Sequence, residues 1–499
     1  MTLKEIFGDL GADVTGDAEI LGITNDSRKV KPGDLFFAVT GLKDDGNAYI
    51  LSAIANGAAA IATGKPVPAE LISAHPRTAW VRAADLPAAF SKASDRFYGR
   101  PSRRFTLIGI TGTNGKTTTA YLLETIYALA GARPGVIGTI DYRVDGKVLA
   151  KAANTTPTAA DLHSLFRTMA DAGADAVVME VSSHALALKR ADEAAFDVAL
   201  FTNLQRDHLD FHKDRETYFN AKLRLFELLA ASPKKNKSAV VNADEEKAGA
   251  IVSALSCGVA PVTYGIDKPA DFRASEIKIL QDRTVFELNA RGTRRKVTLR
   301  LLGRYNVYNA LAAVAAAVSA GVPLETAVKG AETLASVPGR LERVDLGQTF
   351  GVFVDYAHTD AALENVLTNL GRMPHGRIIT VFGYGGDRDR TKRAPMAEAA
   401  ARLSDHAILT SDNPRGEDPA RIFADMEAGL KGAFANYTLL PDRKTAIMKA
   451  VELARAGDIV LIAGKGHEDY QILKDRTIHF DDREAAAEAI KEKTKNRGL

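Results

Sequence analysis

One glycine-rich stretch of this sequence has the composition of a phosphate-binding loop. Residues 109–118 are Gly-Ile-Thr-Gly-Thr-Asn-Gly-Lys-Thr-Thr. Glycines let main-chain N–H groups turn toward an anion, a lysine neutralises phosphate charge, and a threonine hydroxyl can ligate Mg²⁺. The residues predicted to bind a polyphosphate are Gly112, Thr113, Asn114, Gly115, Lys116, Thr117 and Thr118.

The segments on both sides of this loop predict the elements that must position it. Residues 105–111 are apolar or β-branched and predict a buried strand, and residues 120–129 are amphipathic and predict a helix that opens at Lys116. The general P-loop pattern expects glycine at position 110, where this chain has Ile110. The alternative is therefore an ordinary strand-to-helix turn with a surface lysine.

Two further polar residues follow predicted strands and suit metal binding. Glu180 ends the strand predicted over residues 176–181, where its carboxylate could reach Mg²⁺ directly or through water. Its alternative role is to cap the next helix. His208 follows the strand predicted over residues 198–202 and is a candidate ligand of a second metal ion, although a lone loop histidine is usually structural or solvated.

Uncharged polar residues and one lysine form weaker candidates. Residues 154–157, Asn-Thr-Thr-Pro, suit hydrogen bonding to a sugar or a carboxylate, with a plain turn as the alternative. Asn306 lies near the start of a predicted alanine-rich helix and could contact an adenine. Lys222 lies in an amphipathic segment, and by itself it would be assigned to the surface.

Composition indicates an ordinary soluble globular protein. The chain has 499 residues, of which 46% are hydrophobic and 25% charged, and a net charge of +3 gives no sign of a nucleic-acid surface. One cysteine, Cys257, excludes an internal disulfide and is expected to be a small apolar filler. The sequence has neither a signal-peptide pattern nor a membrane span, so we expect a cytoplasmic protein.

Strand and helix patterns divide the chain into three domains. Residues 1–102 predict a small N-terminal α/β domain, residues 103–337 a central P-loop domain with a mostly parallel sheet, and residues 338–499 a C-terminal doubly wound α/β domain. Pro101 and the Pro-Gly-Arg sequence at residues 338–340 mark the boundaries. The charged tail, residues 491–499, is expected to be frayed.

An ordered series of motifs gives this chain its resemblance to a known family. The series is Gly-Thr-Asn-Gly-Lys-Thr-Thr, Asn-Thr-Thr-Pro, Glu-Val-Ser-Ser-His, Thr-Asn-Leu-x-x-Asp-His-Leu-Asp, Asn-x-x-Asn, Pro-Gly-Arg and Asp-Tyr-Ala-His. It is similar to that of the Mur ligases, which join an amine to a carboxylate with ATP. The resemblance covers most of the chain and implies one domain for a uridine nucleotide, one for ATP and one for an amino acid.

The resemblance also implies roles for particular residues. Lys222 matches a lysine that is carbamylated to N6-carboxylysine, which would hold a second Mg²⁺ with Glu180 and His208, while Thr117 and Glu180 hold the first. Asn306, Arg340 and Asp355 match positions that contact ATP. Ser27 and the loop 41–46 match the site for the uridine diphosphate of UDP-MurNAc-L-Ala-D-Glu. The positions matching its muramoyl-dipeptide site are Asn154, Thr155, Thr156, Ser182 and Arg190. A glutamine usual in the family is replaced by Leu188, which cannot donate the same hydrogen bond.

The C-terminal domain carries the residues expected to select the amino acid. Residues 412–415, Asp-Asn-Pro-Arg, resemble the motif of Mur ligases that take meso-diaminopimelate. That substrate differs from lysine by a distal carboxylate, for which an arginine offers a planar fork while an aspartate can pair with the ammonium. The complete predicted set is Arg388, Asp412, Asn413, Pro414, Arg415, Gly464 and Glu468.

These expectations define a reaction and its alternatives. We expect a monomeric ligase of peptidoglycan precursor synthesis that uses Mg²⁺ and ATP to activate the D-glutamyl carboxylate of UDP-MurNAc-L-Ala-D-Glu as an acyl phosphate, which the amine of meso-diaminopimelate attacks. The first alternative is the same ligation with L-lysine. A folylpolyglutamate synthetase, or a P-loop ATPase that makes no bond, leaves the loop 412–415 unexplained.

Overall fold

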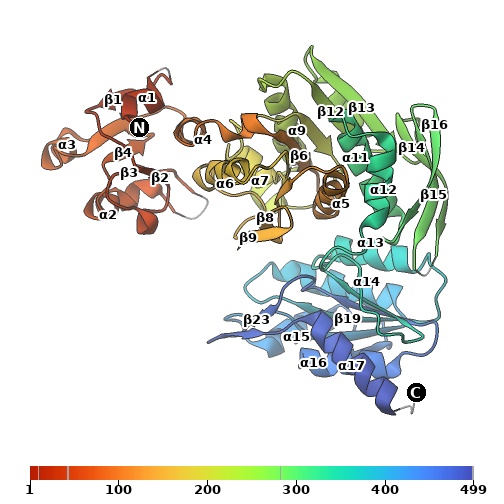
Figure 1. Cartoon of the computed structure of the whole chain (residues 1–499). Coiled ribbons are helices and arrows are strands. Elements are labelled where there is room, and N and C mark those ends of the chain that lie inside the picture. Colours follow the sequence, from red (N-terminus) through yellow and green to blue (C-terminus); the bar gives the residue numbers. More distant parts are fainter. Residues whose placement is uncertain (9, 42–43, 281, 497–499) are drawn as a thin grey trace. The chain divides into compact units, whose positions relative to one another are not determined.

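Strands and helices alternate through the part of the chain that the structure describes, which comprises residues 1–8, 10–41, 44–280 and 282–496 (Figure 1). The structure is a computed structural model. The chain separates into two units. The first contains Met1–Arg273 and Asn309–Ala331, and the second contains Ala274–Tyr308 and Glu332–Leu499.

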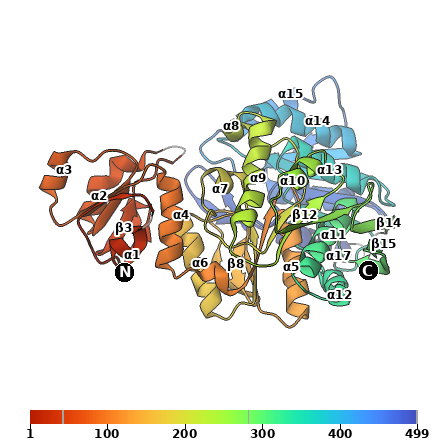
Figure 2. The same cartoon turned by 90° about the horizontal axis from the view of Figure 1, so that it is seen from above.

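A five-stranded sheet forms the N-terminal part of the first unit. Its order is β1 (Asp13–Thr15), β5 (Ala79–Arg82), β4 (Ala60–Thr63), β3 (Asp34–Phe37) and β2 (Gly22–Thr24), all parallel except β1. Alternate residues of β3 pack on opposite faces, because side chains in a strand alternate. Figure 2 shows this sheet with helices around it, namely α1 (Leu3–Phe7), α2 (Ile50–Ala55), α3 (Ala69–Ala74) and α4 (Leu86–Phe97).

A larger sheet carries the glycine-rich loop. Its order within the first unit is β13 (Val259–Gly265), β12 (Lys237–Asn242), β11 (Val198–Phe201), β6 (Thr106–Thr111), β10 (Ala176–Glu180), β7 (Pro134–Ile137), β8 (Asp141–Val144) and β9 (Lys147–Lys151). Strands β13 to β7 are parallel, while β8 and β9 are antiparallel. Because β6 lies between β11 and β10, the loops that follow these three strands meet at one sheet edge.

Helices cover this sheet and bury its apolar side chains. One core joins the strands to α6 (Ala159–Asp171), α7 (Ser183–Ala187) and α9 (Arg215–Ala231). Helix α5 (Lys116–Leu129) packs against β6, β7 and β10. Further helices of this unit are α8 (Leu209–His212) and α10 (Ala248–Ser253), while β14 (Phe272–Ile279), α11 (Arg304–Ser319) and α12 (Leu324–Thr333) each cross a boundary between the two units.

The second unit contains an antiparallel hairpin and a second doubly wound sheet. The hairpin is β15 (Thr284–Ala290) with β16 (Thr293–Leu299). The sheet order is β17 (Glu342–Arg343), β18 (Gly351–Asp355), β22 (Ile459–Ala463), β19 (Ile378–Tyr384), β20 (His406–Ser411) and β21 (Tyr437–Leu439), parallel except for β17. Strands β23 (Tyr470–Ile472) and β24 (Thr477–His479) pair beside it.

Two helical layers enclose the doubly wound sheet, as its continuous apolar strands require. Helices α13 (Asp360–Leu370), α14 (Arg393–Leu403) and α15 (Pro419–Ala428) share a core with one face. Helices α16 (Arg443–Leu453) and α17 (Asp482–Asn496) share a core with the other face and lie side by side in Figure 1. The predicted α/β class and the strands named above are therefore confirmed.

Two expectations from the sequence are wrong. Cys257 is exposed and fills no core, because it lies in the turn before β13. The tail is helical as far as Asn496, and Lys493 donates hydrogen bonds to Val451 O at 2.7 Å and Glu452 O at 2.8 Å at the end of α16. Residues 497–499 of the predicted frayed tail lie outside the described residues. No helix among the described residues is long and apolar enough to cross a membrane.

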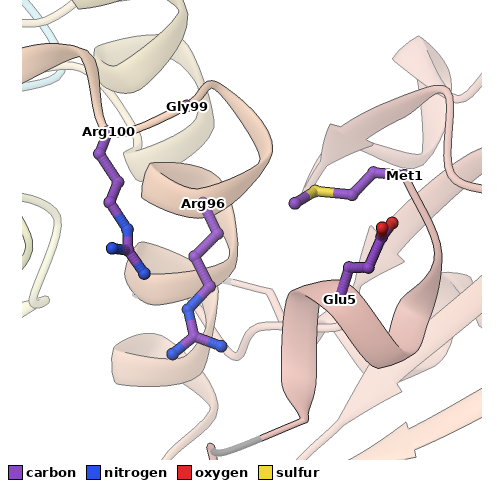
Figure 3. Close-up of a pocket in the computed structure, with 5 residues that line it drawn as sticks. All are labelled: Met1, Glu5, Arg96, Gly99 and Arg100. Atoms are coloured by element: carbon purple, nitrogen blue, oxygen red, sulfur yellow. The ribbon is translucent and has the colours of Figure 1, made fainter.

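A surface pocket near the start of the chain lies away from the predicted site residues. It has a volume of about 310 Å³ and is lined by Met1, Glu5, Arg96, Gly99 and Arg100 (Figure 3). Arg96 donates a hydrogen bond to Ile6 O at 3.0 Å, which ties α4 to α1. None of the described residues predicted for the site lines this pocket.

Candidate active site

The glycine-rich loop turns sharply between β6 and α5. Gly112 has φ +141° and Gly115 has φ +88°, both in the region that favours glycine. A Cβ on Gly112 would lie 1.8 Å from Thr202 Oγ1, and one on Gly115 would lie 2.4 Å from Asn309 Oδ1. Only glycine fits at these positions. The loop therefore presents main-chain N–H groups at the N-terminus of α5, as anion binding requires.

Side chains from the loop after β11 hold the glycine-rich loop in place. Asn203 Oδ1 accepts from Asn114 N, and Asn203 O accepts from Thr113 N, both at 2.9 Å. The Lys116 ammonium turns back over the loop and donates to Gly112 O and Thr113 O, each at 2.8 Å. These contacts place the charge of Lys116 over the loop that is predicted to hold phosphates.

Glu180 is bound to the start of α5 and to the turn after β7. Its side chain is 1% exposed, and Oε2 accepts from Thr117 Oγ1 at 3.0 Å. Thr139 donates its main-chain N–H to Oε1 and its hydroxyl to Oε2, each at 3.0 Å. A Cβ on Gly138 would lie 2.5 Å from Oε1, so glycine permits this approach. Ser182, not Glu180, caps the following helix through Ala185 N, so the capping alternative for Glu180 is wrong.

Four residues predicted for the dipeptide surround the end of β10. Thr156 Oγ1 donates to Glu180 O at 2.8 Å and accepts from Ser182 N at 3.0 Å. Arg190 Nη1 donates to Thr156 O at 3.1 Å. The Thr155 hydroxyl lies 3.1 Å from that of Thr139. The structure thus brings Thr155, Thr156, Ser182 and Arg190 together beside Glu180. Asn154 directly precedes Thr155 in the chain, and its carbonyl accepts a hydrogen bond from Tyr142 OH at 2.6 Å.

Ser27 lies in the N-terminal sheet region, apart from this cluster. It begins a short 3-10 helix capped by Asp26, and its carbonyl accepts from Asn56 Nδ2 at 2.9 Å. Within the described part of the chain, no hydrogen bond joins Ser27 to the residues around Glu180. Leu42 and Lys43 of the predicted uridine loop lie outside the described residues.

Lys222 is buried, contrary to its assignment to the surface from sequence alone. The residue is 2% exposed, and its ammonium lies 4.2 Å from the centre of the Tyr218 ring. Among the described residues it makes no hydrogen bond and no ion pair. Burial lowers the pKa of Lys222 well below its usual value, and the charge of Lys116 lowers it further. The neutral amine, which can react with CO₂, is therefore favoured.

Tyr218 joins Lys222 to the glycine-rich loop and to His208. Its hydroxyl lies 3.2 Å from Thr113 Oγ1, and its ring centre lies 6.2 Å from that of His208. His208 has φ +52° and forms a 3.4 Å ion-pair contact with Asp207 when protonated. The rings of His208 and His184 lie 4.8 Å apart.

The structure brings together the two residues that are predicted to hold the first magnesium ion. Thr117 Oγ1 and Glu180 Oε2 are oxygen donors at the start of α5, and Mg²⁺ prefers such oxygen donors. No group of three His, Cys, Asp or Glu side chains in the described ranges could hold a metal ion. The second predicted site includes Lys222, whose unmodified ammonium is a cation and cannot ligate Mg²⁺.

The residues of the second unit that are predicted to contact ATP lie in two places, one at the end of β18 and one at the start of α11. Asp355 ends β18 and accepts from Leu341 N at 2.7 Å and from Ala357 N at 2.8 Å. The Arg340 guanidinium lies 4.9 Å from the centre of the Tyr356 ring. Asn306 lies in the first turn of α11 and donates to Leu302 O at 2.8 Å. Arg340 and Asp355 are therefore neighbours, and burial raises the pKa of Asp355.

Loops after β19 and β20 carry residues that are predicted to bind the amino acid. Gly386 N donates to Asn413 O at 2.9 Å, and a Cβ on Gly386 would lie 1.9 Å from Pro414 O. Arg415 Nη1 donates to Gly386 O at 2.9 Å and to Asn413 O at 3.4 Å. In the described chain, Arg415 has no carboxylate partner. Arg388 lies on the same loop as Gly386 and is exposed.

The loop after β22 adds further residues of the predicted amino-acid set to this cluster. Glu468 Oε2 accepts a hydrogen bond from Asn413 Nδ2 at 3.0 Å. Gly464 has φ +118°, and a Cβ on this residue would lie 3.2 Å from Asp412 Oδ2. Gln471 Nε2 donates to Asp412 O at 2.6 Å. The structure therefore brings Asp412, Asn413, Pro414, Arg415, Gly464 and Glu468 together.

Two residues in these clusters were missed by sequence reasoning. Thr139 binds both oxygens of Glu180, and Lys465 lies between Asp412 and Glu468. Lys465 lies within the Gly-Lys-Gly-His-Glu motif, so its position between two predicted ligands was an available signal. Thr139 follows a strand whose end meets the P-loop edge, but no local pattern distinguishes it.

Comparison with known proteins shows which family this chain resembles. Three family profiles match: "Mur ligase family, catalytic domain" over residues 19–98, "Mur ligase middle domain" over 110–317 and "Mur ligase, glutamate ligase domain" over 339–466. The UDP-N-acetylmuramoyl-L-alanyl-D-glutamate–2,6-diaminopimelate ligase of Solibacter usitatus is 46% identical over 473 residues, covering 95% of this chain and 94% of its own. The enzyme of that name from Bacillus cereus is 45% identical, covering 98% of each chain.

Solved structures resemble this one over nearly its whole length. A structure of UDP-N-acetylmuramoyl-L-alanyl-D-glutamate–2,6-diaminopimelate ligase has a TM-score of 0.70 and 33% identity, covering 95% of both chains. MurF ligase from Thermotoga maritima, solved in complex with ADP, has a TM-score of 0.60 and 19% identity, covering 95% of this chain and 98% of its own. The second likeness shows the shared fold alone.

Proposed function

The chain belongs to the Mur ligase family, and on that premise we propose that it joins meso-2,6-diaminopimelate to UDP-N-acetylmuramoyl-L-alanyl-D-glutamate with ATP. The amide would form at the D-glutamyl side-chain carboxylate, in peptidoglycan precursor synthesis. The observation that carries the choice of amino acid is the environment of Arg415, whose guanidinium donates to main-chain carbonyls and has no carboxylate partner within the described residues. A substrate carboxylate would supply that partner.

Residues of the first unit would bind ATP and the acceptor carboxylate. The N–H groups of the glycine-rich loop and the Lys116 ammonium would hold the phosphates, with Thr113, Asn114 and Thr118 part of the same loop and helix turn. Thr155, Thr156, Ser182 and Arg190 lie beside Glu180, which supports their proposed role in placing the dipeptide close to the γ-phosphate. Asn154 and Ser27 are proposed to contact the rest of the UDP-substrate.

Mg²⁺ is proposed to bind at Thr117 and Glu180, with a second ion at Glu180, His208 and carbamylated Lys222. Bound there, the ions would neutralise phosphate charge during transfer. Carbamylation adds the neutral Lys222 amine to CO₂ and releases one proton, which yields an N6-carboxylysine. The buried amine without a hydrogen-bond partner among the described residues supports this step.

The reaction then needs two transfers. The acceptor carboxylate takes the γ-phosphoryl group of ATP and becomes an acyl phosphate, with release of ADP. The amine of diaminopimelate attacks the acyl carbon, loses a proton, and phosphate leaves. The chain's contribution is positioning and charge neutralisation. Arg340, Asp355 and Asn306 of the second unit are proposed to contact the nucleotide.

Further properties follow from this proposal. Domain boundaries at residues 102/103 and 337/338 would separate the uridine, ATP and amino-acid sites. We propose a cytoplasmic monomer, because ATP and a nucleotide-linked precursor are cytoplasmic substrates and each predicted substrate contact comes from one chain.

Phosphate release from Mg·ATP tests the function. The purified chain is assayed with UDP-N-acetylmuramoyl-L-Ala-D-Glu and either meso-diaminopimelate or L-lysine, with each acceptor omitted in turn. Release that needs the UDP-dipeptide and diaminopimelate together is expected. A preference for lysine would keep the ligase and overturn the amino-acid assignment. Release that needs neither acceptor would indicate an ATPase that makes no bond.

A further inference from the structure

Lys465 is a completely buried cation among the residues proposed to bind the amino acid. It is 0% exposed, although it lies in a loop after β22. Its ammonium contacts Glu468 Oε2 and Asn413 Oδ1 at 3.2 Å each, and Asp412 Oδ1 at 3.4 Å. The Tyr470 ring centre lies 5.5 Å from it. A buried ammonium is retained only where its partners repay its desolvation.

The partners of Lys465 are residues proposed above to bind the substrate. Asp412 and Asn413 follow β20, while Glu468 follows β22, so the ammonium joins two loops from different strands. Asn413 also donates to Glu468 Oε2 at 3.0 Å. Lys465 therefore sets the positions and the charge of the groups that an amino-acid substrate would meet.

The charges in this network match a zwitterion. Two carboxylates, Asp412 and Glu468, and one ammonium, Lys465, leave one net negative charge. Arg415 adds one positive charge and contacts the same network through Asn413 O. The other buried cation nearby, Arg443, is matched by Asp482 at 2.7 Å. Arg388, the remaining charged residue of the predicted set, is exposed and makes no hydrogen bond or ion pair to these groups within the described residues. The residues joined by these contacts therefore carry two negative and two positive charges.

We propose that Lys465 is a specificity-determining positioning residue that makes the pocket accept an ammonium and a carboxylate on the same carbon. Its charge cancels one of the two carboxylates, so the pocket balances a zwitterionic substrate end. Without Lys465, the two carboxylates and Arg415 together would carry one net negative charge. A substrate end that carries only an ammonium would match that negative charge better than a zwitterionic end. This inference deepens the proposed function and rests on it.

Substitution of Lys465 by Met tests this inference. The measured quantity is kcat/KM for meso-diaminopimelate divided by kcat/KM for L-lysine. Lys465→Met is expected to lower this ratio at least about tenfold, because an unbalanced buried charge discriminates between substrates by such factors. The fall should come mainly from a higher KM for diaminopimelate, with KM for ATP unchanged. Lys465→Arg keeps the charge and is expected to retain most of the ratio.

A double variant separates charge from packing. Lys465→Met combined with Glu468→Gln restores one net negative charge and is expected to recover part of the ratio. Arg377→Met is the matched control, because Arg377 pairs with Asp458 at 2.6 Å at the opposite end of the same sheet. It is expected to lower stability and leave the ratio unchanged.

The outcomes are distinguishable. If the wild-type chain does not use diaminopimelate, the proposed function fails before Lys465 is tested. If the wild type uses it and Lys465→Met loses activity with an unchanged ratio, Lys465 is only structural and the inference is overturned. If Lys465→Met does not fold, the ratio of the two kcat/KM values is measured instead for Lys465→Gln and for the double variant. A ratio equal to that of the wild type in both variants overturns the inference.

Discussion

Thr139 binds both carboxylate oxygens of Glu180, with its main-chain N–H on Oε1 and its hydroxyl on Oε2, each at 3.0 Å. Glu180 is also the acceptor for Thr117 at the start of α5. The carboxylate is thus oriented by a turn after β7 and by the helix after the glycine-rich loop. A ligand fixed from two sides is pre-organised for a metal ion.

Replacement of Thr139 by Val should therefore impair catalysis. The hydroxyl donation to Glu180 Oε2 is lost, while the volume and the main-chain N–H remain. We expect kcat to fall about ten- to hundredfold, as for other groups that orient metal ligands, with a higher Mg²⁺ requirement. Steady-state phosphate release at varied Mg²⁺ measures both. Thr139→Ser keeps the hydroxyl and should remain close to wild type; equal losses in the two variants would exclude the hydrogen bond as the cause.

The Lys222 amine should take up CO₂. Its burial and the nearby Lys116 lower its pKa, which favours the reactive neutral form. With ¹³C-labelled bicarbonate, we expect a carbamate carbon signal in the NMR spectrum of the wild type that is absent from Lys222→Arg, because a guanidinium does not form this carbamate. Lys222→Arg should lose activity by at least about a hundredfold. Full activity in that variant would remove carbamylation from the mechanism.

Local segments of this protein could be predicted from the sequence, and long-range partners could not. The β6 strand, the glycine turn and α5 are adjacent in sequence, so periodicity and glycine placement identify them together. Thr139 and Glu180 are 41 residues apart, and they meet only because β7 and β10 are neighbours in the sheet. Sequence periodicity contains no information about that strand order.

The amino-acid pocket shows the same division. The Asp412–Arg415 loop was identified from its motif, whereas the contact of Lys465 with Asp412 spans 53 residues and two strands. The order β22, β19, β20 brings their loops to one edge. Residue type alone would place Lys222 at the surface and Cys257 in the core, and both assignments are wrong, because residue type alone does not determine burial.

Arg415 should be needed for diaminopimelate and not for the nucleotides. Its guanidinium has only main-chain acceptors in the described chain, so a substrate carboxylate would form its charge-assisted pair. Such a pair contributes about 1.5–3 kcal/mol, so Arg415→Ala should lower kcat/KM for diaminopimelate about ten- to hundredfold. ATP and UDP-substrate affinities, measured by calorimetry, should not change. Undiminished ligation would remove Arg415 from the pocket.

A buried acid away from the site should make stability depend on pH. Asp95 of α4 is 3% exposed and its Oδ1 lies 3.4 Å from His163 Nδ1 of α6 without a hydrogen bond. Burial raises the pKa of Asp95 to about 7, with Glu193 adding to the rise, and burial lowers the pKa of His163 to about 3. The folded chain therefore holds a proton on Asp95 that the unfolded chain has released between about pH 4 and pH 7.

That difference has a defined sign. Over this interval the unfolded state binds fewer protons at Asp95, so the contribution of Asp95 to the free energy of unfolding falls as pH rises and levels off above about pH 7. His163 contributes in the opposite direction between about pH 3 and pH 6.5, but it is present in both the wild type and the Asp95→Asn variant.

The Asp95→Asn substitution removes only the contribution of Asp95. Relative to wild type, the Asp95→Asn variant should gain thermal stability between pH 4 and pH 8, as measured by calorimetry at several pH values. The rise in pKa sets an upper bound of about 4 kcal/mol for this gain. Parallel profiles for the two proteins would mean that Asp95 titrates alike in the folded and unfolded chains, and would contradict its assignment as a buried, protonated acid.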